Sequence, residues 1–302
     1  MKNFLFWVLA FLITAGAAVY QRMTGPTYPV RGTIVIQNNG IDFQLDRSHE
    51  TLQDYRIHIE APNPQIKGSV EFKRFKSRDE WSHIPLRREG TVLTALLPYQ
   101  PPAGKLAYRV ILIMQDEEVS LTGEKPVVMR FKGAVPGWLL IPHVIIMFAA
   151  MLFSTRAGIE AFRPKKNPRV LVIWTTCLLF MGGMILGPLV QKYAFGALWT
   201  GFPFGTDLTD NKTLIAMIGW IIALIACRKE KPARGWVIAA AVLLLAVYLL
   251  PHSLLGSELD YSQLPPNSTE ISAAPFIIKP FDPIHHAENI DFIPIYAYLN
   301  YS

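Results

Sequence analysis

The sequence predicts an α+β membrane protein in which an exported antiparallel β-sandwich precedes a helical transmembrane bundle. Residues 28–134 alternate apolar and polar side chains, with turn-forming residues between the short runs. Four long apolar runs follow residue 135, and Arg and Lys are concentrated in the links at one end of these runs. Because basic loops stay on the cytoplasmic side, this bias fixes a topology more firmly than any feature fixes a reaction.

The composition supports a membrane protein and argues against a nucleic-acid partner. The chain has 302 residues, of which 51% are hydrophobic and 17% charged, whereas soluble domains are usually about 25% charged. The net charge is +6, but the two basic links alone hold nine basic and two acidic residues. The positive charge is therefore a topology signal and not a phosphate-binding patch.

Residues 1–25 form a signal peptide or a signal anchor. Lys2 precedes an apolar run from Phe4 to Ile13, and a small-residue pattern, Ala15-Gly16-Ala17, follows. This pattern is compatible with cleavage, but the apolar stretch continues to Tyr20 and favours an uncleaved anchor. In both cases the segment that follows is exported, and an uncleaved amino terminus lies inside.

Residues 26–134 are expected to form an extracytoplasmic β-sandwich. Six runs read as strands, and turn signals such as Asn38-Asn39-Gly40 and Pro101-Pro102 separate them. An alternation of period two with frequent breakers is typical of an immunoglobulin- or fibronectin-like sandwich. The runs are Thr33–Ile36, Tyr55–Ile59, Val70–Phe75, Thr91–Leu97, Leu106–Met114 and Val127–Phe131.

Residues 135–256 are expected to form four transmembrane helices, each near the length that a bilayer requires. The basic links lie between the first and second helices and between the third and fourth. With the amino-terminal segment, this places the sandwich and the carboxyl terminus outside a bacterial-type inner (plasma) membrane. The predicted spans are Val135–Ser154, Val170–Gln191, Thr213–Cys227 and Gly235–Leu255.

Residues 257–302 form an extracytoplasmic tail with six acidic residues, one Lys and six Pro. The tail lacks a clear period, yet it is richer in Ile, Phe and Tyr than disordered segments usually are. We expect it to pack in an extended form along the sandwich or along a partner protein.

Two histidines, His143 and His252, each follow a proline within the apolar runs. Ionisable residues at membrane depth are candidates for function, and two histidines on different helices would suit one haem b. Met147 and Met151 share the helix face of His143 and would suit copper. A quinone, lipid or proton-handling role is also open. The structural alternative is that each histidine bonds a carbonyl freed by its proline and that the methionines fill packing gaps.

A second group of candidates consists of carboxylates near the outer helix ends. Asp207, Thr209 or Asp210 would cap the helix that follows the Gly- and aromatic-rich segment 193–212. The functional alternative is that this segment forms a re-entrant lid over the region of His143 and His252. Asp207 and Asp210, with His252, Glu258 and Asp260, would make a hard-cation site. Their alternatives are solvation or pairing with Lys192 and Lys212.

The sequence contains none of the common catalytic or cofactor motifs, such as a P-loop, CxxCH, HExxH or GxSxG. Cys177 and Cys227 fall within or at the end of apolar runs, so no disulfide framework is predicted. The leading hypothesis is a non-enzymatic accessory protein that presents its sandwich and tail to an exported partner. The alternative is a membrane redox protein with haem b or copper, and a transporter component is third.

The charge bias makes a direct prediction about topology. Reporter fusions after residues 25 and 261 should be active outside, and fusions at residues 160 and 231 should be active inside, because basic links resist translocation. Activity of paired periplasmic and cytoplasmic reporters checks this. An outside reporter at residue 165 would overturn the topology.

Overall fold

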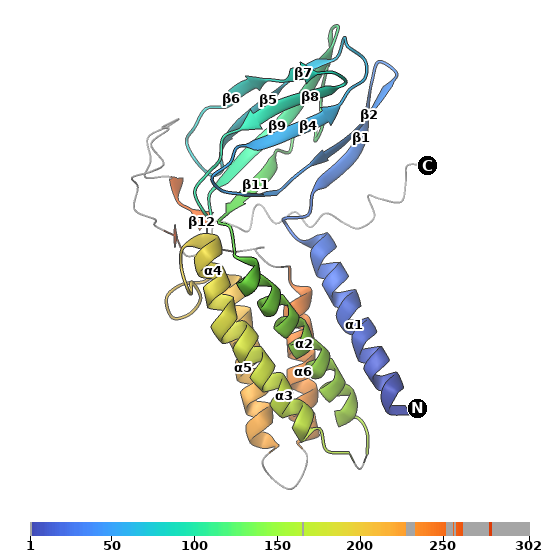
Figure 1. Ribbon diagram of the computed structural model, residues 1–302, viewed down its shortest axis with the longest axis vertical. Helices are drawn as coiled ribbons and strands as arrows, with labels where there is room; N and C mark the ends of the chain where they lie inside the picture. Colours follow the sequence, from blue (N-terminus) through green and yellow to red (C-terminus); the bar gives the residue numbers. More distant parts are fainter. Residues whose placement is uncertain are drawn as a thin grey trace.

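The computed structural model shows a β-domain stacked on one end of a helical bundle (Figure 1). It describes residues 2–164, 166–227, 233–251, 256, 258–261 and 278–279. The amino-terminal helix α1 (Lys2–Thr24) lies against α2 and α6 of the bundle, and the chain then rises into the β-domain.

The β-domain contains two main sheets and a two-stranded ribbon. The larger sheet has the order β3-β11-β9-β5-β6, with β10 paired to β9, and the smaller has the order β4-β8-β7. Every pairing is antiparallel except that of β11 with β3. The strands are β1 (Val30–Ile36), β2 (Asn39–Leu45), β3 (Ser48–Glu50), β4 (Tyr55–Glu60), β5 (Lys67–Arg74), β6 (Ser82–Pro85), β7 (Arg87–Glu89), β8 (Val92–Leu97), β9 (Lys105–Met114), β10 (Glu117–Ser120) and β11 (Val127–Lys132).

All six predicted strands are confirmed, and one hydrophobic core lies between the sheets. The apolar residues of the predicted alternation, such as Ile57 in β4, Leu97 in β8 and Val110 in β9, are buried in it. Tyr108 is also fully buried and donates a hydrogen bond from its hydroxyl to the Asp46 carbonyl at 2.7 Å. The sequence analysis missed β2, β3, β6, β7 and β10.

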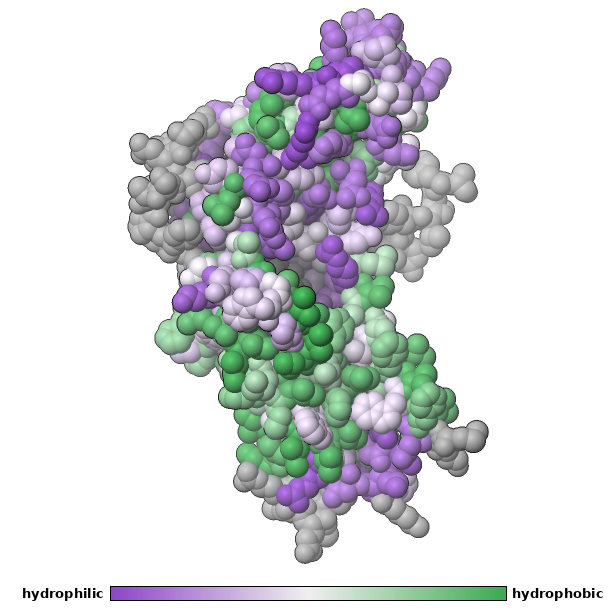
Figure 2. Space-filling model, viewed as in Figure 1, coloured by the Kyte–Doolittle hydropathy of each residue, from purple (hydrophilic) through white to green (hydrophobic). Residues whose placement is uncertain are grey.

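Four helical stretches in the described residues are long and apolar enough to cross a membrane: Asn3–Thr24, Gly137–Ala161, Arg169–Phe195 and Leu208–Ala226. Figure 2 shows apolar side chains across the helical part and polar ones over the β-domain and at the far end. The last helix, α6 (Arg234–Leu249), has 16 residues and spans about 24 Å. The other elements are α2 (Gly137–Ala161), α3 (Arg169–Leu179), the π-helix η1 (Phe180–Leu186), α4 (Gly187–Phe195) and α5 (Leu208–Ala226).

Polar contacts tie α1 to the bundle at the end that carries the basic residues. Glu160 forms ion pairs with Arg156 at 2.6 Å and with Arg163 at 2.9 Å. Arg163 also donates to the Asn3 side chain at 2.9 Å and lies over the ring of Phe6. The sequence predicted that this helix ends at Ser154. These contacts explain why α2 continues to Ala161.

At the opposite end, a backbone contact joins the β-domain to the bundle. The Gly133 amide donates to the Ala194 carbonyl at 2.8 Å, close to the carboxyl end of α4. A Cβ atom at Gly133 would overlap the Tyr193 carbonyl oxygen, so only glycine permits this approach. The β-domain is therefore seated directly on the helices.

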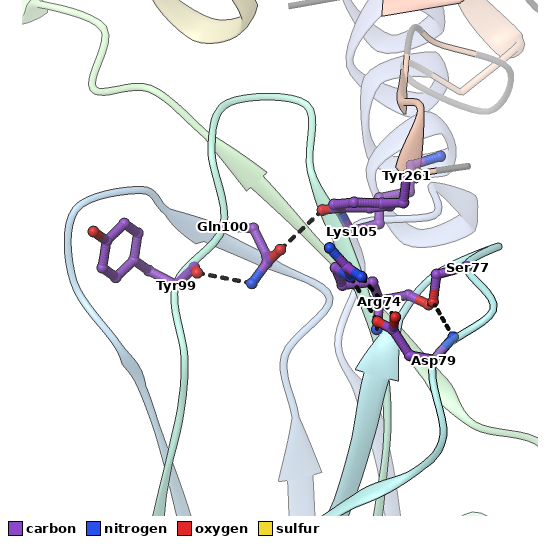
Figure 3. Close-up of polar contacts among 7 residues, drawn as sticks. All are labelled: Arg74, Ser77, Asp79, Tyr99, Gln100, Lys105 and Tyr261. Carbon is purple, nitrogen blue, oxygen red and sulfur yellow. Dashed lines mark hydrogen bonds and ion pairs between the residues drawn. The ribbon is translucent and has the colours of Figure 1, made fainter. Parts of the chain in front are cut away.

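The first part of the tail packs on the β-domain, as Figure 3 shows for Tyr261. The Tyr261 hydroxyl donates to the Gln100 side chain at 3.0 Å and accepts from the Lys105 amide at 3.0 Å. Glu258 forms ion pairs of 2.6 Å with both Lys76 and Lys105. Residues 258–259 form β12 (Glu258–Leu259), which pairs with β13 (Ile278–Lys279). Residues 258–261 of the tail therefore lie on the β-domain.

The Glu258 carboxylate should hold the tail in a pH-dependent way. Burial alone would raise the pKa of Glu258, but Lys105 and Lys76 more than offset this effect, so the pKa lies below its usual 4.5. A lowered carboxyl pKa contributes stability that is complete above the usual value and is lost as the pH falls through the folded-state pKa. Docking should therefore weaken as the pH falls below 4.5 and through the lowered pKa of Glu258.

Glu258→Gln should loosen the same contact at neutral pH by about 1–2 kcal/mol, because it removes a carboxylate from two charged hydrogen bonds. The readout is hydrogen exchange of the Leu259 amide, which donates to the Ala103 carbonyl at 3.1 Å. Glu124→Gln, in an exposed turn, is the control. Unchanged exchange in Glu258→Gln would show that the ion pairs do not hold the tail.

Candidate functional site

A cavity of about 390 Å³ lies among the helices at the end that carries the β-domain. Helices α1, α2, α4, α5 and α6, the π-helix η1 and strand β11 all contribute to its walls. Its polar side chains include Gln21, Arg130, His143, Gln191, Asp207 and Asp210. Its larger apolar side chains include Leu140, Val144, Phe148, Val190 and Phe195. Cavities of this size, mainly apolar with a few convergent polar groups, are typical ligand sites.

His143 stands at the α2 wall of the cavity. Its Nδ1 atom lies 3.0 Å from the Gly182 carbonyl oxygen, which accepts hydrogen bonds only, so Nδ1 carries the proton. The carbonyl belongs to η1 in the neighbouring helix, and not to the turn of α2 that Pro142 interrupts. A Cβ atom at Gly182 would lie 2.7 Å from Met147 Sδ, so glycine allows the two helices to approach.

Gln21 of α1 and Lys212 of α5 donate hydrogen bonds to backbone carbonyls at the carboxyl end of α6, beside the cavity. The Gln21 amide nitrogen donates to the Tyr248 carbonyl at 2.7 Å and to the Leu250 carbonyl at 3.3 Å. Lys212, which is 4% exposed, donates to the same Leu250 carbonyl at 2.8 Å. Both residues therefore satisfy carbonyls that a helix end leaves without partners, and the cation also complements the helix dipole. The Tyr248 hydroxyl donates to the Met147 carbonyl at 2.7 Å.

Asp207 and Asp210 fix the segment between α4 and α5. Asp207 is the N-cap of α5 and accepts from the Thr209 amide at 2.8 Å, which confirms the predicted cap. Asp210 Oδ2 accepts from the Thr200 amide at 2.6 Å, the Gly201 amide at 3.0 Å and Gln191 at 3.1 Å. The apolar run predicted a start at Thr213. The cap explains why α5 begins earlier, at Leu208.

Arg130 brings a β-domain residue into the cavity wall. It is 6% exposed, and its guanidinium carbon lies 4.2 Å from the centre of the Phe195 ring. Burial lowers the pKa of Arg130 to about 10, while Asp207 and Glu258 act in the opposite direction. The guanidinium therefore remains charged at neutral pH. Sequence reasoning missed Arg130, although a charged residue at the end of the last strand before the helices was a signal.

The structure brings together four of the candidate residues. His143, Met147, Asp207 and Asp210 all line the cavity. Met151 is buried elsewhere in the bundle, and His252 lies outside the described residues.

The two tail carboxylates fall outside this group. Glu258 pairs with lysines of the β-domain and not with Lys192 or Lys212, and Asp260 follows it on the docked tail. Among the residues that the structure describes, no three His, Cys, Asp or Glu side chains are arranged to hold a metal ion.

Comparison with known proteins gives no relative: no family model, no curated protein and no solved structure matches the chain. Function must therefore be argued from the cavity itself.

The Asp210 carboxylate should control the order of the segment between α4 and α5. Asp210→Ala leaves the Thr200 and Gly201 amides without their acceptor, at a cost of about 2–4 kcal/mol. We expect faster chymotrypsin cleavage after the exposed residue Phe204. Asp116→Ala, at an exposed turn between β9 and β10, is the control. Equal cleavage rates in the two variants would refute this role for Asp210.

Proposed function

We propose that this chain is a non-enzymatic binding protein of a bacterial-type plasma membrane. It holds a small amphiphilic molecule in the cavity and presents its β-domain and tail, on the outer side, to an exported partner protein. In this proposal the β-domain is an exported sandwich of immunoglobulin- or fibronectin-like type, and the basic end of the bundle faces the cytoplasm.

The observation that carries the proposal is the composition of the cavity wall. Apolar side chains such as Val144 and Phe148 continue the apolar surface of the bundle, whereas Arg130, Gln21 and Gln191 place polar groups in the same space. An amphiphile has this division, with a chain for the apolar wall and a head group for the polar wall. The position also suits such a molecule, because the cavity lies at the end of the apolar helices.

Arg130 supports the link to a partner protein. It belongs to β11, whose neighbouring side chains Met129 and Phe131 are fully buried in the β-domain core. A molecule in the cavity would therefore touch a residue whose backbone is part of the exported domain. This gives the β-domain a direct way to respond to occupancy.

The haem or copper alternative stays a prediction. In its favour, the Nε2 atom of His143 is the ring nitrogen not used on Gly182, and Met147 lies on the same cavity wall. The second predicted ligand, His252, lies outside the described residues. A visible spectrum and metal analysis of the purified protein test this alternative.

Photolabelling in lipid nanodiscs tests the proposed function. The probes are a dodecyl alcohol that carries a diazirine and its methyl ether, and the labelled peptides are mapped by mass spectrometry. At least one probe should label cavity residues saturably. Ala18→Phe should reduce labelling at least tenfold, because Ala18 lines the cavity and a larger side chain would fill it.

Gly16→Phe is the matched control, since Gly16 is exposed on the same helix with no atom near its Cβ position. Labelling that does not saturate, or that Ala18→Phe leaves unchanged, would contradict a binding site in the cavity.

A further inference from the structure

We infer the ligand class from the hydrogen-bonding atoms of the cavity, and this inference rests on the proposed function. The ligand is a neutral amphiphile whose head group carries hydroxyl groups, and it donates hydrogen bonds to His143, Gln21 and Gln191.

The orientation of His143 leaves an acceptor. Its Nδ1 proton is donated to the Gly182 carbonyl, at 3.0 Å. A neutral imidazole with a proton on Nδ1 has a lone pair on Nε2, which can accept one hydrogen bond. Among the described residues, no donor reaches this atom.

Gln21 and Gln191 resemble His143, because each uses its donors within the protein and retains an acceptor. Each amide nitrogen has two protons, and Gln21 directs them at the Tyr248 and Leu250 carbonyls. Gln191 directs its protons at the Thr200 hydroxyl, at 2.6 Å, and at the Asp210 carboxylate, at 3.1 Å. Carbonyl and carboxylate oxygens only accept, so these partners fix which end of each amide is nitrogen. The two amide oxygens are left without a donor in the described part of the chain.

These acceptors are not sealed in the protein interior. Neither the His143 ring nitrogen nor the two amide oxygens is among the fully buried polar atoms that lack a partner in the described residues. All three residues line the cavity. Because the three side chains surround one cavity, a ligand that supplies donors there could form hydrogen bonds with them.

Two of the neighbouring hydroxyl groups already donate within the protein, so neither is left to donate to a head group. The Tyr248 hydroxyl donates to the Met147 carbonyl, and the Thr213 hydroxyl donates to the Thr209 carbonyl at 2.9 Å. An ammonium head group would also donate, but it would compete with the buried Arg130 guanidinium, which already interacts with the Asp207 carboxylate of the same wall. Hydroxyl groups supply donors without a second positive charge.

The experiment compares three dodecyl diazirine probes in nanodiscs: the alcohol, its methyl ether and the corresponding amine. The alcohol should half-saturate cavity labelling at a concentration three- to tenfold lower than the ether, the range expected for one net hydrogen bond. His143→Asn should lower this ratio, although the Gln21 and Gln191 oxygens are still present to accept. An asparagine amide can still donate to the Gly182 carbonyl, whereas it lacks the Nε2 acceptor. The control is His58→Asn, on an exposed strand of the β-domain, which should keep the wild-type ratio.

The outcomes separate this inference from the proposed function. Equal half-saturation by alcohol and ether, or tighter binding of the amine, would overturn the ligand class and leave the binding site in place. An alcohol preference that is unchanged in His143→Asn would overturn the assignment of His143. Saturable labelling by none of the probes would overturn both proposals.

Discussion

The arrangement of the whole molecule depends on the contact between Gly133 and the carboxyl end of α4. The Gly133 amide reaches the Ala194 carbonyl because no side chain stands between them. This contact sets β11 directly over the helix ends, so Arg130 is buried against Phe195 and becomes part of the cavity wall. A longer or bulkier connection would separate the β-domain from the bundle and would open the cavity to solvent.

The cavity is a consequence of how the helix ends are satisfied. The last carbonyls of α6 accept hydrogen bonds from Gln21 and Lys212. At the amino end of α5, the Asp207 carboxylate accepts a hydrogen bond from a backbone amide. These residues act as caps, because each forms hydrogen bonds with backbone atoms at a helix end. The hydrogen bonds of Gln21 and Asp207 therefore influence which of their atoms remain on the cavity side. Structural and functional interpretations of Asp207 and Asp210 are in this sense compatible.

The sequence predicted the parts whose physical signal is local. Alternation located six strands, because the two-residue period of a strand is visible wherever one face is buried. The strand β2 was not among these six, although Ile41, Phe43 and Leu45 alternate directly after the Asn38-Asn39-Gly40 turn. Hydropathy located the helices, but not their ends at Ala161 and Leu208, since an ion pair and a cap extend them past the apolar runs. Arg130 escaped notice because its role depends on a contact between distant segments.

The position of α1 makes the same point in terms of energy. In the proposed membrane setting, no hydrophobic force drives an apolar helix onto other apolar helices, because lipid chains are equally apolar. Its place against the bundle therefore depends on polar contacts at both ends, with Asn3 bound to Arg163 and Gln21 bound to the Tyr248 and Leu250 carbonyls. The second of these contacts uses the Gln21 side-chain nitrogen. The side-chain oxygen of Gln21, which lines the cavity, is therefore still able to accept a hydrogen bond. The group that fixes the helix is thus the group that prepares the site, and neither role can be removed without the other.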